Sequence, residues 1–208
     1  MSVTGVPQTT GLVSRVQNLL MKPAAEWDVI DGEAASVGSL YMGYACILAA
    51  IPALASLVSS LLFVHMFIVA ALIGAVLGYA LNLVGCFIVA LIIDALAPSF
   101  GAQKSQIQAL KLAIYANTAV WVAGIANVIP VLGGLVVLAG YIYTLYTMYL
   151  GLPKLMKSPA DKTVGYFVVT IVVSILVYVL IAVVLSIIVG MLMVGAVATG
   201  AASMGGLH

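Results

Sequence analysis

Five long apolar stretches decide what this chain can fold into. A helix of about 20 apolar residues crosses the roughly 30 Å hydrocarbon core of a bilayer, and each stretch is at least that long. None shows the alternation of apolar and polar residues that is typical of membrane β-strands. We therefore expect an all-α integral membrane protein with five transmembrane helices. They run approximately over Gly38–Phe63, Phe67–Leu96, Ile107–Ile129, Leu132–Leu152 and Val164–Val194.

The composition excludes several other classes of protein. Only 6% of the 208 residues are charged and 65% are hydrophobic, whereas about 25% of a soluble domain is charged. Much of the surface must therefore face lipid. The net charge of +1 excludes a protein that binds nucleic acid by electrostatics. Cys46 and Cys86 both fall in apolar stretches, where we expect free thiols rather than a disulfide.

The positions of the basic residues predict the orientation in the membrane. With five spans, the segment before the first span and the polar loops after the second and fourth spans all lie on one side. These segments, with the start of the third span, hold all seven cations, so the positive-inside rule places them in the cytoplasm. The N-terminus is then cytoplasmic and the C-terminus lies outside. The cations are Arg15, Lys22, Lys104, Lys111, Lys154, Lys157 and Lys162.

Residues 1–37 are expected to form a cytoplasmic amphipathic segment. This segment is expected to hold two short helices, and the second begins at Pro23 and carries Trp27, a residue suited to the headgroup layer. Two arrangements stay open: the two helices lie along the cytoplasmic leaflet, or they pack over the end of the bundle. The first helix has its apolar residues at helical spacing, at Leu12, Val13, Val16, Leu19 and Leu20.

The rest of the chain divides into a transmembrane domain, residues 38–194, and a tail of small residues, 195–208, that we expect to be mobile. The fifth apolar stretch has 31 residues, about 46 Å as a helix. It exceeds the hydrocarbon thickness, so it must tilt, break or protrude, and we favour protrusion.

Asp94 is the one acidic residue within an apolar stretch, near the cytoplasmic end of the second span. A carboxylate in the bilayer is costly unless it is paired or functional. One interpretation is a structural pair at the interface with Lys104 or Lys111. The other is a proton or ion site.

Three amides also lie within apolar stretches: Asn82 in the second span, and Asn117 and Asn127 in the third. Buried amides in membrane proteins usually form hydrogen bonds between helices. Alternatively, Asn82 and Asn117 line a polar cavity, which requires that they face each other.

Small residues and tyrosines predict contacts of two kinds. Gly74 and Gly78 form a Gly-x-x-x-Gly pattern, over which a second helix can approach closely, within the bundle or in a homodimer. Tyr146 and Tyr149 in the fourth span fall at the predicted headgroup level, where tyrosines anchor a helix.

No arrangement of residues typical of an enzyme is present. The two histidines are His65, in a loop, and His208, at the terminus, and the cysteines form no Cys-x-x-Cys pair. We therefore expect no catalytic residue, no metal site and no cofactor.

Several segments of the sequence carry a family resemblance: Lys22-Pro23 followed by Trp27, Phe100-Gly101, Lys111–Ala116, Ile129–Gly134, and Tyr141–Leu152 followed by Lys154. Together they resemble the bacterial branch of the Yip family of Ypt/Rab-interacting membrane proteins. The resemblance implies five spans, a cytosolic N-terminus and an outside or lumenal C-terminus, and for a bacterial chain it implies the inner membrane.

In eukaryotic members the resemblance also implies trafficking roles in the early secretory pathway and contact with Rab GTPases. Those members carry an Asp-Leu-Tyr-Gly-Pro motif in a long cytosolic tail, and this sequence lacks that motif. We therefore transfer the fold and not the GTPase contact. The first functional hypothesis is a scaffold or organising factor that associates with itself or with other membrane proteins. The alternative is a small transporter, channel or lipid-moving protein with a polar pathway through Asp94, Asn82 and Asn117.

Overall fold

The computed structural model describes residues 11–63, 68–180 and 183 of the chain. The predicted tail, 195–208, and the predicted end of the fifth span lie outside the described residues. The chain divides into two compact units, Met1–Thr170 and Ile171–His208, and each is described by itself.

Five helical segments are long and apolar enough to span a membrane, which confirms the predicted all-α fold. Within the described residues every regular element is a helix. The starts and ends of the first four spans lie within a few residues of those predicted from the sequence. The spans are Val37–Leu62, Ala71–Phe100, Gln106–Val128, Pro130–Leu155 and Ala160–Leu180.

Three of the spans contain a short turn of a different helix type. The first span contains α3 (Val37–Leu40), a π-helical turn η1 (Tyr41–Ala45) and α4 (Cys46–Leu62). The second comprises most of α5 (Ile68–Leu96) and ends in the 3₁₀ turn η2 (Ala97–Phe100). The third is divided into α6 (Gln106–Ala116), α7 (Thr118–Ala123) and the 3₁₀ turn η3 (Gly124–Val128). The fourth is the single helix α8 (Pro130–Leu155).

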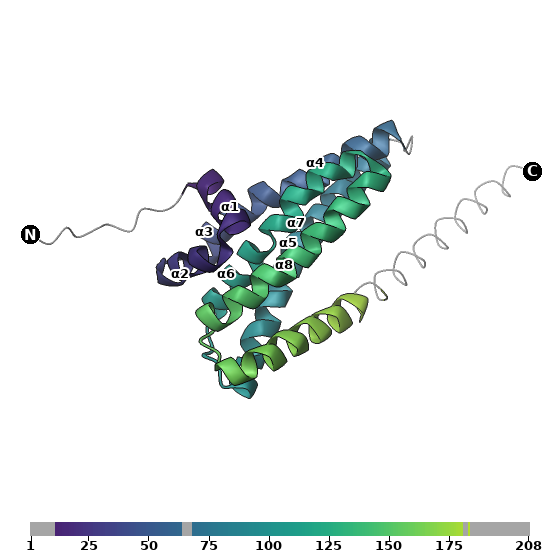
Figure 1. Cartoon of the computed structure of the whole chain (residues 1–208). Helices are drawn as coiled ribbons and strands as arrows, with labels where there is room; N and C mark the ends of the chain where they lie inside the picture. Colours follow the sequence, from purple (N-terminus) through teal and green to yellow (C-terminus); the bar gives the residue numbers. More distant parts are fainter. Residues whose placement is uncertain (1–10, 64–67, 181–182, 184–208) are drawn as a thin grey trace, which may run out of the picture. The chain divides into compact units, whose positions relative to one another are not determined.

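The third span is the central element of the bundle. In its most apolar stretch 67% of the residues are buried, against 22–28% in the first, second and fourth spans. It packs against α4, α5 and α8 (Figure 1). Gly140 allows the close contact between α8 and α7, because a Cβ atom at this position would lie 2.8 Å from Cβ of Ala123 and 3.1 Å from Cα of Val120.

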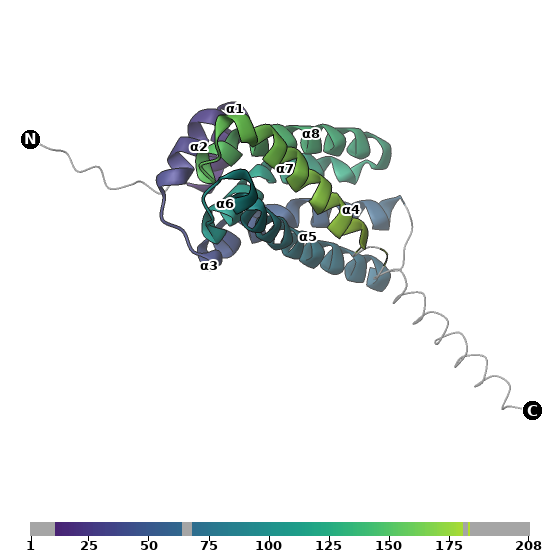
Figure 2. The ribbon, with the colours of Figure 1, turned by 90° about the horizontal axis from the view of Figure 1, so that it is seen from below.

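The two N-terminal helices pack onto one end of this bundle. They are α1 (Leu12–Met21) and α2 (Pro23–Gly32), and α2 lies against α8 (Figure 1 and Figure 2). Of the two arrangements left open by the sequence, the structure has the packed one, with Leu19 and Ile30 buried.

Trp27 has a different environment from the headgroup layer expected for it. Its side chain is 0% exposed, and its indole Nε1 donates a hydrogen bond of 2.9 Å to the carbonyl oxygen of Thr147. The ring lies against Gly151, where a Cβ atom would be 2.7 Å from Cε2 of the indole. The expected anchoring role is therefore wrong, because α2 turns this face toward the protein and not toward lipid.

Buried charges fix α1 to α2. Arg15 is buried, with 3% of the residue exposed, and its guanidinium donates to Glu26 at 2.6 Å and also to Glu33. The same guanidinium lies 5.5 Å from the ring centroid of Tyr115 in α6. Lys111 of α6 donates to the carbonyl oxygens of Ile30 and Glu33 at 2.9 and 2.5 Å. Because each buried cation has polar partners, these charges can lie at the protein interior.

Exposed ion pairs join α2 to the far end of α8. Lys154 contacts Asp28 at 2.7 Å and Lys157, in the loop after α8, contacts Asp31 at 2.5 Å.

The loop after η2 joins the same region, since the backbone amide of Gln103 donates to the carbonyl oxygen of Met156 at 2.7 Å. We call this part of the bundle, made of α1, α2 and the two loops 101–105 and 156–159, the charged end.

Candidate functional site

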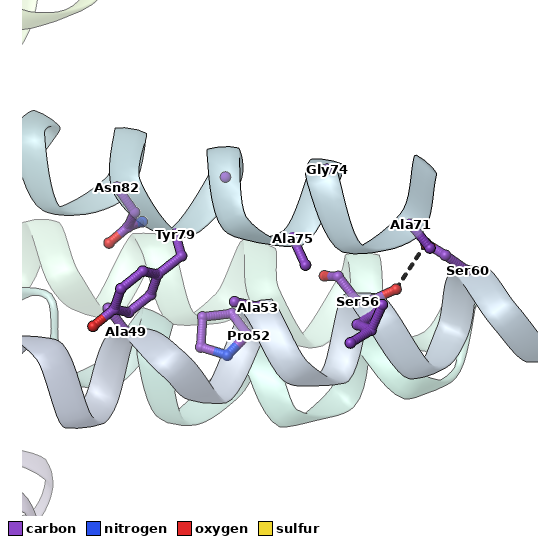
Figure 3. Close-up of a pocket in the computed structure, with 12 residues that line it drawn as sticks. Ala49, Pro52, Ala53, Ser56, Ser60, Ala71, Gly74, Ala75, Tyr79 and Asn82 are labelled. Carbon is purple, nitrogen blue, oxygen red and sulfur yellow. Dashed lines mark hydrogen bonds between the residues drawn. The ribbon is translucent and has the colours of Figure 1, made fainter. Parts of the chain in front are cut away.

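A groove between α4 and α5 is the candidate functional site. Its volume is about 390 Å³, and Figure 3 shows small side chains from both helices along its walls. Helix α4 contributes Ala49, Pro52, Ala53, Ser56, Leu57 and Ser60, and helix α5 contributes Ala71, Gly74, Ala75, Gly78, Tyr79 and Asn82.

The two helices are held together along one edge of the groove. Tyr79 points from α5 toward α4, beside Ala49 (Figure 3), and its hydroxyl donates a 3.0 Å hydrogen bond to the carbonyl oxygen of Cys46. Tyr41 of η1 makes a similar bond of 3.0 Å to the carbonyl oxygen of Leu83. These bonds fix the separation of α4 and α5, and therefore the width of the groove.

Gly74 and Gly78 are exposed on the α5 wall. In the part of the chain that the structure describes, no atom lies within 4 Å of a Cβ built on either glycine. Gly140 and Gly151 differ, because neighbouring helices already fill the space beside them. The glycine pattern of α5 is thus not used for packing among the described residues.

Polar atoms are spaced along the groove. The amide oxygen of Asn82 accepts a 2.7 Å hydrogen bond from the indole of Trp121. Ser56 lies farther along the groove on α4 (Figure 3), where its hydroxyl accepts a 3.4 Å hydrogen bond from Asn127. Ser60 donates to the carbonyl oxygen of Ser56 at 2.8 Å, the bond drawn in Figure 3. Asn82 therefore lines the groove, whereas Asn127, from a different span, contacts one of its lining residues, Ser56.

Asn117 lies elsewhere and is not part of this wall. Its amide donates to the carbonyl oxygen of Ala113 at 2.7 Å and to the sulfur of Cys86 at 3.7 Å. Asn82 and Asn117 therefore do not both line this groove.

Asp94 is nearly buried, with 9% of the residue exposed. Its Oδ1 atom has no hydrogen-bond partner among the described residues. The expected ion pair with Lys111 or Lys104 is wrong for the described chain, where neither lysine forms a salt bridge to Asp94. Lys111 instead satisfies backbone carbonyls of the α2 segment. The hydroxyl of Tyr166 lies beside Asp94 and donates to the carbonyl oxygen of Ile93 at 2.5 Å.

Tyr146 and Tyr149 are exposed on α8, with 51% and 38% of each residue accessible. The ring of Tyr146 lies 5.6 Å from that of Tyr143, and the ring of Tyr149 lies 5.3 Å from that of Phe167. An anchoring role in the headgroup layer stays a prediction for both.

The α4 wall of the groove is the part that sequence reasoning missed. Ser56 and Ser60 are one helical turn apart, the spacing that places two hydroxyls on one face, and that signal was available in the sequence. Among the described residues no group of three or more His, Cys, Asp or Glu side chains could hold a metal ion. What the groove offers instead is room for a closely packed helix, with hydroxyl and amide partners at its walls.

These observations define an integral, multi-pass, all-helical membrane protein whose outer surface contacts the lipid bilayer. The sequence matches the family described as the Yip1 domain over residues 18–183, and the chain therefore belongs to that family. No curated protein and no solved structure gives a significant match to the sequence.

Proposed function

We propose that this protein is a non-enzymatic membrane scaffold that associates, through the groove between α4 and α5, with a transmembrane helix of a second copy. The observation that carries the proposal is the open space beside Gly74 and Gly78. At Gly140 and Gly151, by contrast, a neighbouring helix already fills the space beside the glycine. The groove is therefore a helix-packing surface without a helix among the described residues.

The physics of association in lipid favours such a surface. Lipid chains are as apolar as leucine, so helices gain little from burying apolar area and depend on close packing and polar contacts. A Gly-x-x-x-Gly face lets two backbones approach, and each hydrogen bond between helices contributes about 0.6 to 2 kcal/mol. Ser56, Ser60 and Asn82 supply such polar groups beside the glycines.

The distribution of charge supports an inner-membrane protein with a cytoplasmic N-terminus. The ion pairs and lysines of the charged end gather at one end of the spans, and the positive-inside rule assigns this end to the cytoplasm. A Rab-type GTPase contact is not part of the proposal, because the sequence lacks the tail motif associated with it.

Cysteine crosslinking in native membranes tests the proposal. In a Cys46→Ala, Cys86→Ala background, single variants Gly74→Cys and Gly78→Cys are oxidised before solubilisation. The matched control is Gly134→Cys in α8, which is also a glycine without any described atom within 4 Å of a built Cβ. We expect disulfide-linked dimers at both α5 positions and none at the control.

A second arm asks whether the groove drives association. Gly78→Leu fills it, while Gly134→Leu adds the same side chain to α8. We expect the first variant to lower the dimer fraction in mild detergent at least 10-fold and the second to leave it unchanged. The scaffold proposal fails if the protein is a strict monomer and crosslinking in cells recovers no neighbouring membrane protein.

A small transporter, channel or lipid-moving protein is the second candidate, and the unpartnered oxygen of Asp94 favours it. A nearly buried carboxylate in a membrane helix is a common feature of ion and proton pathways. The test is Asp94→Asn in liposomes, which should abolish a flux that the unmodified protein supports. If neither protein carries a flux of protons, sodium or labelled lipid, this candidate is wrong.

A further inference from the structure

A second cavity lies at the charged end, apart from the groove. Its volume is about 180 Å³, and its walls come from α1, the segment after α2, the first turns of the first span and α6. The lining residues used below are Arg15, Glu33, Ser39, Gly43, Tyr44 and Tyr115. We propose that this cavity binds the primary ammonium group of an aminophospholipid headgroup, as in phosphatidylethanolamine.

The location suits a headgroup. Ser39 and Gly43 belong to the first two turns of the span Val37–Leu62, so they lie where the hydrocarbon core meets the polar layer. The cavity has the volume of about six molecules of liquid water, which admits an aminoethyl group and not a whole lipid. The acyl chains would then stay in the bilayer.

The charges at the cavity favour a cation over an anion. Arg15 already donates to Glu26 and Glu33, and its side chain is only 4% exposed. The Glu33 side chain is 18% exposed, so the carboxylate is the more accessible of the two charges. An incoming phosphate would meet the carboxylates of Glu26 and Glu33 beside the guanidinium, and the nearby Lys111 ammonium is already engaged by the carbonyl oxygens of Ile30 and Glu33. An incoming ammonium can pair with the Glu33 carboxylate oxygen that Arg15 does not contact.

Two tyrosine rings line the cavity beside the Glu33 carboxylate. The rings of Tyr44 and Tyr115 form an edge-to-face pair with centroids 4.7 Å apart. The Tyr44 hydroxyl is bonded to Thr118 at 2.7 Å, while the Tyr115 hydroxyl has no hydrogen bond among the described residues. A carboxylate with aromatic rings is a common site for an organic ammonium. A primary ammonium has three donors. The Glu33 carboxylate oxygen that Arg15 does not contact and the Tyr115 hydroxyl can accept two of them, whereas the Ser39 hydroxyl is already hydrogen-bonded to Ser36.

The backbone at this cavity is also unusual. Gly43 and Tyr44 lie in the π-helical turn η1, and single π-helical turns within helices occur often at functional sites. No described atom lies within 4 Å of a Cβ built on Gly43. A larger side chain at this position would enter open space without disturbing a buried contact.

Lipid binding to the purified full-length chain tests the proposal by native mass spectrometry. The probes are phosphatidylethanolamine, phosphatidylcholine and phosphatidylglycerol with identical acyl chains. Phosphatidylethanolamine should bind about 10-fold more tightly than either of the others, as expected for a charge-assisted hydrogen bond. Gly43→Leu, which fills the cavity, and Glu33→Gln, which removes the accessible charge, should each abolish this preference. Gly134→Leu is the matched control and should retain it.

Three results would overturn the proposal: equal binding of the three lipids, tighter binding of phosphatidylglycerol, or an unchanged preference in Gly43→Leu. A competition experiment with soluble glycerophosphoethanolamine distinguishes binding of the lipid from binding of the free headgroup. If it displaces the lipid at equal concentration, the ligand is the free headgroup and the lipid assignment is wrong. Gly43→Leu keeps the test valid if Glu33→Gln fails to fold. Failure of this site would leave the crosslinking at Gly78 unaffected, so it is distinguishable from failure of the scaffold proposal.

Discussion

The charged end and the groove between α4 and α5 are built from opposite kinds of contact. At the charged end, Trp27 is wholly buried and Arg15 has two carboxylate partners. At the groove, Gly78 has no described neighbour within 4 Å of a built Cβ. The buried side chains of the charged end already have protein partners, whereas the glycines of the groove have none among the described residues.

This difference shows which part of the molecule is structural. The N-terminal helices are fixed to the bundle by buried hydrogen bonds from Trp27 to Thr147 and from Lys111 to Ile30 and Glu33, which would break if the helices left it. The α4–α5 pair is held along one edge by tyrosine hydroxyls, so its groove persists without a partner. Four substitutions test the contrast, from the largest expected effect to the smallest.

Arg15→Gln should cost about 3 to 5 kcal/mol in the free energy of unfolding, because it leaves Glu26 buried without its ion pair. Unfolding by SDS in mixed micelles measures this loss. The double variant with Glu26→Gln should recover part of it, since the unpaired charge is then gone. A loss below about 1 kcal/mol would mean that the charged end does not depend on this pair.

Gly151→Ala should cost about 1 to 3 kcal/mol, because the added methyl group meets the ring of Trp27 and the side chain of Leu112. A Cβ atom there would lie 2.6 Å from Cδ1 of Leu112. Gly78→Ala is the matched control in the same assay, on the monomer, and should not be destabilised. Equal losses at the two glycines would remove the contrast between the regions.

Trp121→Phe should cost about 0.5 to 1.5 kcal/mol, the usual range for one hydrogen bond. It removes the indole donor to Asn82, which links the central span to the groove. Thermal unfolding in detergent measures the change. If crosslinking at Gly78→Cys stayed intact in this variant, the width of the groove would depend on the tyrosine bonds alone.

Lys154→Gln should have the smallest effect, about 0.2 to 1 kcal/mol, because it removes an exposed ion pair. The side chains of Lys154 and Asp28 are 30% and 68% exposed. High salt should reduce the difference between the variant and the unmodified protein. A loss as large as that of Arg15→Gln would show that exposed pairs, and not buried ones, fix α2 to the bundle.

The spans could be predicted from the sequence because a long apolar segment in lipid must satisfy its own backbone hydrogen bonds, and an α-helix is the structure that does so. The Gly74 and Gly78 pattern also predicted one wall of the groove. What could not be predicted was which polar residues the protein itself would cover. The helical spacing of Leu12, Val16 and Leu19 puts Arg15 on the opposite, polar face. Its burial depends on Glu26 and Glu33, which reach it only after α2 folds back.

The same limit explains the errors at Trp27 and Asp94. A tryptophan near the bilayer surface suits either the headgroup layer or a helix contact, and only the space beside Gly151 decides between them. From the sequence, Lys111 was expected at the same end of the bundle as Asp94 and was therefore a candidate partner for its carboxylate. Its side chain instead reaches backbone carbonyls of the α2 segment, because α6 turns that face toward α2.

The central position of the third span has a consequence for biosynthesis. This span has the lowest mean hydropathy of the five, and it carries Lys111, Asn117 and Asn127, whose partners lie on other elements. Polar groups of this kind raise the free energy of leaving the translocon for lipid. We therefore expect the third span to leave the translocon together with a neighbouring helix, so that the order of synthesis and the order of membrane integration differ.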